Sequence, residues 1–414
     1  MSCVILGAGK IARGFVGHLL YLSEIPFIFI ERSRQLADLI NERGAYTVNI
    51  LGHSEKNCEV QGVSALDLAQ EEEAAEAIAE AEAVFTAVGG KNLEELLPVL
   101  VKGIEKKAKR GGNLNIVTCE NWKCPADFLR SGIDNRICEE AKTYLAKHVG
   151  ITEAVVMRSA IEPDEEQLKK DPLTVNVQDF WELPVDASRV VGKLPQIRGV
   201  KLIQEFAGFL ERKFYTYNAA NGTVAYVGAL LGYEKIADAA HDERILEILD
   251  GVYQETAQAL AKKYHLPLEE QLAFALTSKR KLQDYSIVDT IERNARDPIR
   301  KLGKDDRLLG AARLAQEYGV EPVNLCLGIA AAIYYENDED ESARELRRKR
   351  EEEGLDNLLE DICGIDPYES LANLIKSRIG RLSKWKWLKE KRSVEEILKE
   401  MREKRMEGMG KSNE

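Results

Sequence analysis

Short apolar runs alternate with stretches of helical periodicity along the first half of the chain. The runs lie at residues 3–6, 26–30, 83–89 and 114–118, and they are nearly continuous, as in strands that are buried on both faces. Helical spacing lies between them, most clearly at residues 10–22 and 93–109. This alternation predicts a parallel sheet with helices on both faces.

Weaker signals fill the remainder of the first half. Short strands are expected at residues 46–51, 60–63, 154–161 and 173–177, and residues 179–186 are expected at the edge of the sheet. The Ala/Glu-rich run 71–82 is interpreted as a solvated helix, since its charges leave only a narrow apolar face. Residues 125–148 are expected to be helical.

The periodicity changes from residue 200 onward. Apolar residues recur at spacings of three and four, which predicts a helical bundle. The expected helices are residues 200–210, 223–231, 245–264, 308–318, 325–335 and 371–379. The charged stretch that begins at Glu336 is expected to start as an exposed loop.

A chain of 414 residues is too long for a single core, so we expect two domains. The first, residues 1–195, is expected to contain the parallel sheet, and the second, residues 196–382, is expected to be the helical bundle. Residues 383–414 form a charged helical tail that is expected to pack on its own domain, with disorder from residue 407.

Composition narrows the class of protein. A net charge of −12 argues against nonspecific nucleic-acid binding, and neither a membrane span nor a signal peptide is recognisable, so a cytoplasmic protein is expected. The seven cysteines form no C-x2-C pair, and the five histidines form no cluster that resembles a ligand set. We therefore expect reduced thiols and no bound metal.

The first strand runs into a glycine-rich turn that opens a helix. The pattern G-x-G-x-x-A permits a tight turn, a close approach of the backbone to a pyrophosphate and close packing of helix on strand. The second strand is followed by Glu31, whose carboxylate is placed to bind the adenosine ribose and to repel a 2′-phosphate. We therefore interpret residues 1–195 as a Rossmann-type dinucleotide-binding domain and expect residues 196–382 to be the helical substrate and catalytic domain. NAD is favoured, although Arg32 is compatible with NADP. The expected cofactor contacts in this turn are Gly7, Gly9, Lys10, Ile11 and Ala12.

Two further strands end in residues with the same expected role. Val88 and Gly89 follow one apolar run, and Glu120 and Asn121 follow another. Ligands of parallel sheets bind at the carboxyl ends of the strands, so these four residues are predicted to contact the cofactor.

A second group of candidates stands at the start of an apolar helix in the second half. Lys213 lies just before it, and Asn218 and Asn221 are spaced to share one helical face. An amine that accepts a proton and amides that donate hydrogen bonds are the groups that alcohol oxidation needs. The alternative is a solvated helix start, because lysine and asparagine are common surface residues.

A basic cluster stands out in the acidic chain, and its members are predicted to bind a substrate phosphate: Arg293, Arg296, Arg300 and Lys301. On one helix the three arginines would form a cationic stripe, although Pro298 makes an unbroken helix improbable. The alternative is pairing with neighbouring surface aspartates at positions 297, 305 and 306.

These motifs, in their order and spacing, resemble the long-chain polyol (mannitol) dehydrogenases, and among them the mannitol-1-phosphate 5-dehydrogenases. The residues that carry the resemblance, from about position 3 to 376, are Gly7-x-Gly9 with Arg13-Gly14-Phe15-x-Gly17, residues 86–89, residues 119–121, Glu211-Arg212-Lys213 with Asn218, Ala225-Tyr226-x-Gly228, residues 296–302, residues 306–308 and residues 328–332.

The resemblance implies a zinc-independent, NAD-linked enzyme with its active site between two domains. Its reaction interconverts mannitol 1-phosphate and fructose 6-phosphate, with Lys213 as general base and Asn218 as donor to the alkoxide. The sequence departs from the family at Ser159-Ala160, where relatives have Asp-Arg, and at Asn221, where the K-x4-N-x2-H signature has histidine. Both departures concern the substrate side.

Three alternatives follow from these departures. The enzyme acts on another phosphorylated polyol, or on a hexuronate, or the chain is a regulator that binds NAD without turnover. Retention of Lys213 argues against the regulator. A monomer or a small homo-oligomer is expected.

Overall fold

The structure is a computed structural model that describes residues 2–389, with side chains to residue 382. It divides into two compact units, residues 1–207 and residues 208–414, and each is described by itself. The tail predicted at residues 383–414 lies outside the described residues, apart from its first few backbone positions, and so does the disorder predicted from residue 407.

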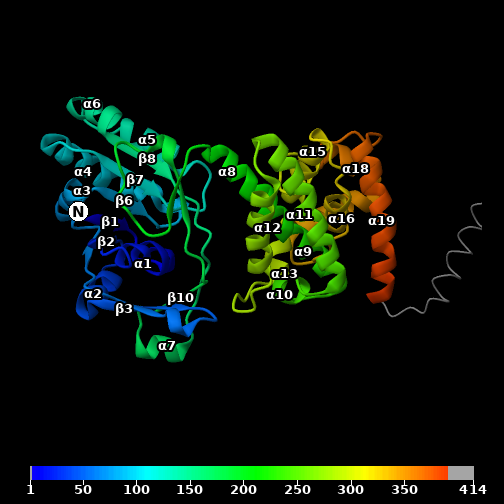
Figure 1. The fold of residues 1–414 in the computed structure, drawn as a ribbon, viewed down its shortest axis with the longest axis horizontal. Coiled ribbons are helices and arrows are strands. Elements are labelled where there is room, and N and C mark those ends of the chain that lie inside the picture. The colour runs from blue at the N-terminus through cyan, green and yellow to red at the C-terminus, as the bar shows by residue number, and fades with distance from the viewer. Residues whose placement is uncertain (1, 390–414) are drawn as a thin grey trace, which may run out of the picture. The chain divides into compact units, whose positions relative to one another are not determined.

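The first unit is built on a six-stranded parallel sheet, which confirms the predicted Rossmann-type architecture (Figure 1). Its strands, in spatial order, are β5 (Ala65–Asp67), β2 (Phe27–Glu31), β1 (Cys3–Leu6), β6 (Ala83–Thr86), β7 (Leu114–Thr118) and β8 (Val149–Glu153). Chain order reverses between β1 and β6, so a crevice opens at the carboxyl ends of these two strands.

Apolar cores lie on both faces of this sheet, as the continuous apolar strands require. One core is formed with a helix that begins at Lys10 and comprises η1 (Ala12–Gly17) and α1 (His18–Tyr21), together with α2 (Arg34–Arg43). The other lies under α3 (Glu71–Glu80), η3 (Gly90–Leu96), α4 (Leu97–Arg110), α5 (Pro125–Asp134) and α6 (Glu139–His148).

Two smaller sheets complete the first unit. One has the order β4 (Cys58–Gln61), β3 (Ala45–Ile50), β10 (Val175–Val177) and β9 (Ala160–Ile161), and the short helix α7 (Glu165–Lys170) connects its last two strands. The other pairs β11 (Leu183–Asp186) with β12 (Val200–Ile203). The segment η1 packs closely on the first of these sheets, since a Cβ at Gly14 would lie 2.5 Å from Val177.

Three predicted boundaries in this unit are wrong. The sixth strand is β8, not residues 154–161, and the helical region before it is two helices. Residues 183–186 pair with β12 instead of forming the edge of the main sheet, apart from one isolated bridge from Val185 to Ala154. Residues 200–203 are strand, and α8 (Phe206–Lys213) begins only afterwards, because backbone pairing with β11 outweighs the helical spacing of the apolar residues.

The second unit is helical, as predicted. Its elements after α8 are η5 (Phe214–Asn218), α9 (Ala219–Leu231), α10 (Ile236–Ala239), α11 (Glu243–Tyr264), α12 (Leu268–Leu282), α13 (Ile291–Ala295), α14 (Pro298–Lys301), α15 (Leu309–Glu317), α16 (Val323–Ile333), α17 (Glu341–Glu352), α18 (Gly354–Asp361) and α19 (Ser370–Lys389). No apolar pattern predicted α12, because two of the four side chains that it buries, Gln271 and Ser278, are polar.

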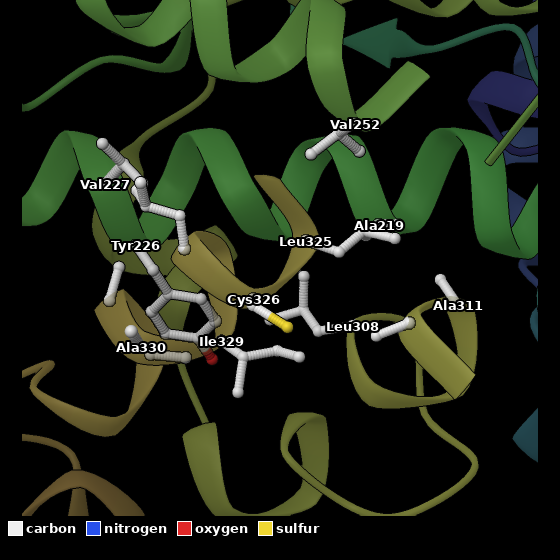
Figure 2. Close-up of a cluster of buried hydrophobic side chains, with 14 of the residues drawn as sticks. Ala219, Tyr226, Val227, Val252, Leu308, Ala311, Leu325, Cys326, Ile329 and Ala330 are labelled. Atoms are coloured by element: carbon white, nitrogen blue, oxygen red, sulfur yellow. The ribbon is translucent and has the colours of Figure 1, made fainter. Parts of the chain in front are cut away.

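The core of the second unit forms around α9 and α16, which are apolar on nearly all sides (Figure 2). Gly328 lets the two helices approach, since a Cβ there would lie 2.7 Å from the Thr223 hydroxyl. The start of α16 is capped from α11, because the buried Glu255 carboxylate accepts the backbone N–H groups of Asn324 and Leu325 at 2.7 and 2.9 Å. This packing fixes α9, which directly follows Asn218 and carries Asn221 in its first turn.

Across the described residues, no helix is both long and apolar enough to cross a bilayer.

Candidate functional site

The glycine-rich turn lies at the switch point of the main sheet. Gly7 has φ +93°, and a Cβ there would lie 2.8 Å from the Ala87 carbonyl oxygen, so a larger residue is excluded by protein contacts. Gly9 differs, because a Cβ there would meet no protein atom within 4 Å. This side of the turn is therefore open to a ligand, and the missing side chain leaves room for the close backbone approach that a pyrophosphate requires.

The peptide groups of Ala8 are held on both sides. Its N–H donates to the Glu31 carboxylate at 2.7 Å, and its carbonyl accepts a hydrogen bond from the Arg13 guanidinium. Arg13 also donates to the Leu173 carbonyl at 3.2 Å, and its burial lowers its pKa. The turn is thus fixed before any ligand binds. Sequence reasoning used Arg13 only as a family motif residue and missed this role.

Glu31 ends β2 beside the turn, as predicted. Its second carboxylate oxygen accepts the Ser33 N–H at 2.9 Å, so backbone donors orient both oxygens. Each oxygen has a further lone pair, which leaves capacity for ribose hydroxyls. Arg32, the residue that keeps NADP possible, donates to both carboxylate oxygens of Glu95 at 2.9 Å.

Glu120 organises the neighbouring strand end. Its buried carboxylate accepts the Val88 and Gly89 N–H groups at 2.9 and 2.8 Å and the Thr86 hydroxyl at 2.9 Å. The segment Val88–Gly89 is therefore shaped by Glu120, which supports it from within. Asn121, by contrast, is exposed.

The remaining predicted cofactor residues lie in the first turn of the helix. Lys10 is half-exposed and pairs with Glu162, Ile11 packs at the margin of the core, and Ala12 is fully buried. The structure thus brings the predicted dinucleotide residues to one edge of the main sheet. A glycine backbone with free space beside it and a fixed carboxylate are features that fit a dinucleotide.

In the second unit, Lys213 and Asn218 lie together. The Lys213 ammonium donates to Asn218 Oδ1 at 3.2 Å. In a regular α-helix, residues five apart point in directions about 140° apart, so this bond would not form. Here η5 is a π-helical turn, in which the Ala219 N–H bonds to the Phe214 carbonyl, and its wider turn brings positions 213 and 218 to one side.

The environment of Lys213 favours the neutral amine. Burial lowers the pKa of Lys213, and the nearby Arg307 guanidinium lowers it further. The Asn218 oxygen faces the amine, while its Nδ2 makes no hydrogen bond to the described residues. Asn221, one turn along α9, is half-buried, and its amide has no hydrogen-bond partner there either. An amine whose neutral form is favoured and two amides with donor groups left free by the described residues therefore share one stretch of helix.

A second lysine belongs to this neighbourhood, and sequence reasoning missed it. Lys281, near the end of α12, is half-buried, and the loss of water around its amine, together with the nearby Lys213, lowers its pKa to about 8. Helix α12 is joined to η5 by a hydrogen bond of 3.0 Å from Gln271 to Thr216. Its irregular apolar spacing gave no signal for the sequence analysis to use.

The predicted phosphate cluster is divided between two short helices, and most of its members are engaged. Arg293 donates to Asp289 at 2.9 Å, and Arg300 donates to Asp297 at 2.6 Å. Lys301 is buried and donates to the carbonyls of Asn294 and Arg296. The exposed Arg296 side chain has no partner among the described residues, so the single cationic stripe does not form.

Comparison with known families decides the class of this protein. Residues 1–199 match the mannitol dehydrogenase Rossmann domain, and residues 205–379 match the mannitol dehydrogenase C-terminal domain. The protein belongs to the mannitol dehydrogenase family. It is accordingly an oxidoreductase of a polyol dehydrogenase family, with an N-terminal dinucleotide-binding domain.

Solved structures share the fold over nearly the whole chain. A D-sorbitol dehydrogenase in substrate-free form is 15% identical with a TM-score of 0.77, and the match covers 94% of this chain and 93% of that one. A mannitol 2-dehydrogenase from Pseudomonas fluorescens, in a ternary complex with NAD and D-mannitol, is 13% identical with a TM-score of 0.64, and the match covers 95% of both chains.

Replacing Gly9 with Val separates ligand binding from folding. The side chain would occupy the space beside the turn, so calorimetric titration is expected to show no binding of NAD or NADP. The melting temperature is expected to stay within a few degrees of the native value, because a Cβ there touches no protein atom. Gly14→Val, which would collide with Val177, is expected to destabilise the unit instead. Undiminished NAD binding by Gly9→Val would refute the hypothesis that the pyrophosphate approaches the backbone at Gly9.

Proposed function

We propose that this protein is an NAD-linked dehydrogenase that oxidises a secondary alcohol of a polyol phosphate. The observation that carries the proposal is the bond from Lys213 to Asn218 across the π-helical turn, in a chain of the mannitol dehydrogenase family. The substrate pair favoured by the sequence resemblance is mannitol 1-phosphate and fructose 6-phosphate.

The residues of the chain divide the work of the reaction. NAD, when bound, accepts the hydride from the carbinol carbon. The neutral Lys213 amine takes the hydroxyl proton, and the Asn218 amide donates to the oxygen as negative charge develops on it. Asn221 supplies a second donor where relatives have histidine. On the nucleotide side, Gly9 admits the pyrophosphate and Glu31 accepts ribose hydroxyls.

Two other assignments remain as alternatives. Another phosphorylated polyol or a hexuronate would use the same base and donors, and Asn221, which is shorter than histidine and does not titrate, favours some shift of substrate. A regulator that binds NAD without turnover would need neither Lys213 nor its lowered pKa. A panel of free polyols, polyol phosphates and hexonates, assayed with NAD by absorbance of NADH, distinguishes these three possibilities.

Lys213→Ala is expected to remove nearly all turnover, a loss of about 1,000-fold or more, because no base remains. Asn218→Ala is expected to cost about 100- to 1,000-fold in kcat, which is typical of the loss of one oxyanion donor. Lys281→Met is the matched control, since it removes the neighbouring ammonium and keeps the base. Steady-state kinetics with NAD test the three variants. A larger loss in Lys281→Met than in Lys213→Ala would assign the base to Lys281.

The pH profile of oxidation is expected to show one inflection from the protein, apart from that of the substrate phosphate itself at about pH 6. The base must be neutral, so kcat/KM rises with pH and levels off above the pKa of Lys213. Burial and Arg307 lower that pKa, which places the inflection below the ordinary lysine value of 10.5. Asn221 has no proton to titrate, so no imidazole inflection is expected near pH 6.5. An inflection that persists unchanged in residual Lys213→Ala activity would contradict this assignment.

Asn221→His restores the family signature and is expected to move activity toward mannitol 1-phosphate. The imidazole reaches further than the amide and can both donate and titrate, so a second inflection is expected in the pH profile. The ratio of kcat/KM for mannitol 1-phosphate to that for the best substrate of the native protein measures the shift. Asn221→Gln, a longer amide, controls for length alone.

A further inference from the structure

Arg307 lies beside the base and outside the cluster of residues that the sequence predicted to bind phosphate. We propose that the Arg307 guanidinium binds the anionic group of the substrate, a phosphate or a carboxylate at one end of an open-chain polyol. This inference rests on the proposed function, because it places the anion relative to Lys213. Arg307, which lies just before α15, would then recognise the negative charge of the substrate.

The position of Arg307 is fixed by packing on the same helix that carries the base and the donors. Its guanidinium carbon lies 5.5 Å from the centre of the Phe214 ring, at the start of η5. Its side chain lies over Gly222, where an added Cβ would be 3.5 Å from Arg307 Cδ. Gly222 directly follows Asn221, so Arg307 faces the first turn of α9.

The start of α15 is held against this helix by two further contacts. Leu308 belongs to the same buried cluster as Ala219, the first residue of α9, as Figure 2 shows. Gly310 allows Tyr215 to approach, since a Cβ there would lie 2.6 Å from the Tyr215 hydroxyl. Arg307 lies at the end of the turn that precedes α15, and the contacts of Leu308 and Gly310 hold this end of the turn against the helix.

The binding end of Arg307 is available. Its Nε donates to Asp306 at 2.8 Å, and its two terminal nitrogens make no hydrogen bond to the described residues. The side chain is only 15% exposed, so a ligand there would be largely shielded from water. Two parallel N–H groups in a fixed plane match the geometry of phosphate and carboxylate oxygens.

The arginines predicted from the sequence are less suited to this role. Arg293 is 69% exposed and donates to Asp289 through two of its nitrogens. Arg300 donates to Asp297 through Nε and to Asp306 through a terminal nitrogen. Charge contacts at exposed positions are weak because water screens them.

Several positively charged side chains lie near Arg307, and they favour binding of an anion there. Burial lowers the pKa of Lys213 and that of Lys301, which falls to about 8, and the Arg307 charge lowers both further, so this charge reaches both lysines. Lys281 adds a further cation near Lys213, while Asp306 is the acidic partner of Arg307 and Asp284 and Asp289 lie near Lys281. An anionic substrate would reduce the repulsion among these cations.

Arg307→Met tests the proposal, because methionine keeps an unbranched aliphatic side chain over Gly222 and removes the guanidinium group. The Michaelis constant for a polyol phosphate is expected to rise roughly 10- to 100-fold, as for the loss of a charge-assisted bidentate contact. At a pH above the inflection of Lys213, where loss of the Arg307 charge does not change the protonation of the amine, the constant for the corresponding neutral polyol and the dissociation constant for NAD are expected to stay unchanged. Arg244→Met, which removes another aspartate-paired arginine of the helical unit, is the matched control and is expected to change none of them.

The assay compares two anionic substrates, a hexitol phosphate and a hexonate. A selective loss for either one supports the proposal and identifies the anion as phosphate or carboxylate. Equal losses for neutral and charged substrates would overturn it, since Arg307 would then only hold the helices. A selective loss in Arg300→Met with none in Arg307→Met would also overturn it, in favour of the cluster predicted from the sequence.

Binding measured without turnover separates this inference from the proposed function. Calorimetric titration of the NAD-saturated protein with hexitol phosphate and with hexonate reports the anion site directly. If no polyol is oxidised but one anion binds to the native protein and not to Arg307→Met, the dehydrogenase proposal fails and the anion site stands. If neither anion binds to the native protein, the assignment of Arg307 is overturned.

Discussion

Backbone N–H groups at the carboxyl edge of the main sheet need hydrogen-bond acceptors, and two glutamates provide them. Glu31 accepts from Ala8 and Ser33, and Glu120 accepts from Val88 and Gly89. Unpaired buried N–H groups would cost free energy, so these bonds fix the turns on either side of the switch point. The shape of the nucleotide edge therefore depends on carboxylates supplied by the strands that end there.

The two units rely on different physical means to prepare their sites. In the first, hydrogen bonds to backbone groups hold a turn that has almost no side chains of its own. In the second, burial adjusts the chemistry of a side chain, because removing the Lys213 ammonium from water favours the amine. Asn218 bonds to this amine and Arg307 lies near it, so both face a group whose neutral form burial already favours. Preorganisation of both kinds reduces the rearrangement needed when substrate and cofactor bind.

The sequence was sufficient for the parts of this protein that follow local rules. The strand, glycine-rich turn and helix at residues 3–22, the acidic end of β2 and the helical periodicity of the second half all followed from spacing. It failed where long-range pairing decides, as in β12, which pairs with β11 despite helical spacing, and in β8, whose glycine weakens the strand signal. The placement of Glu120 as a support beneath Val88 and Gly89, and of Arg307 beside Lys213, depends on tertiary contacts that no local pattern encodes.

The π-helical turn at η5 links the number of residues in this helix to the directions in which its side chains point. Such a turn is equivalent to one extra residue inserted into an α-helix, and the chain keeps it because α9 is fixed by its own core. Deleting one residue between Phe214 and Tyr217 would restore a regular α-helix in which Lys213 and Asn218 are four positions apart, about 40° around the axis, so the two side chains would still share a face. A regular α-helix of unchanged length would instead place them about 140° apart and break the hydrogen bond between them. The number of residues and the π-helical turn are thus coupled in this segment, and a homologous helix that is one residue shorter can present the same pair of side chains without the π turn.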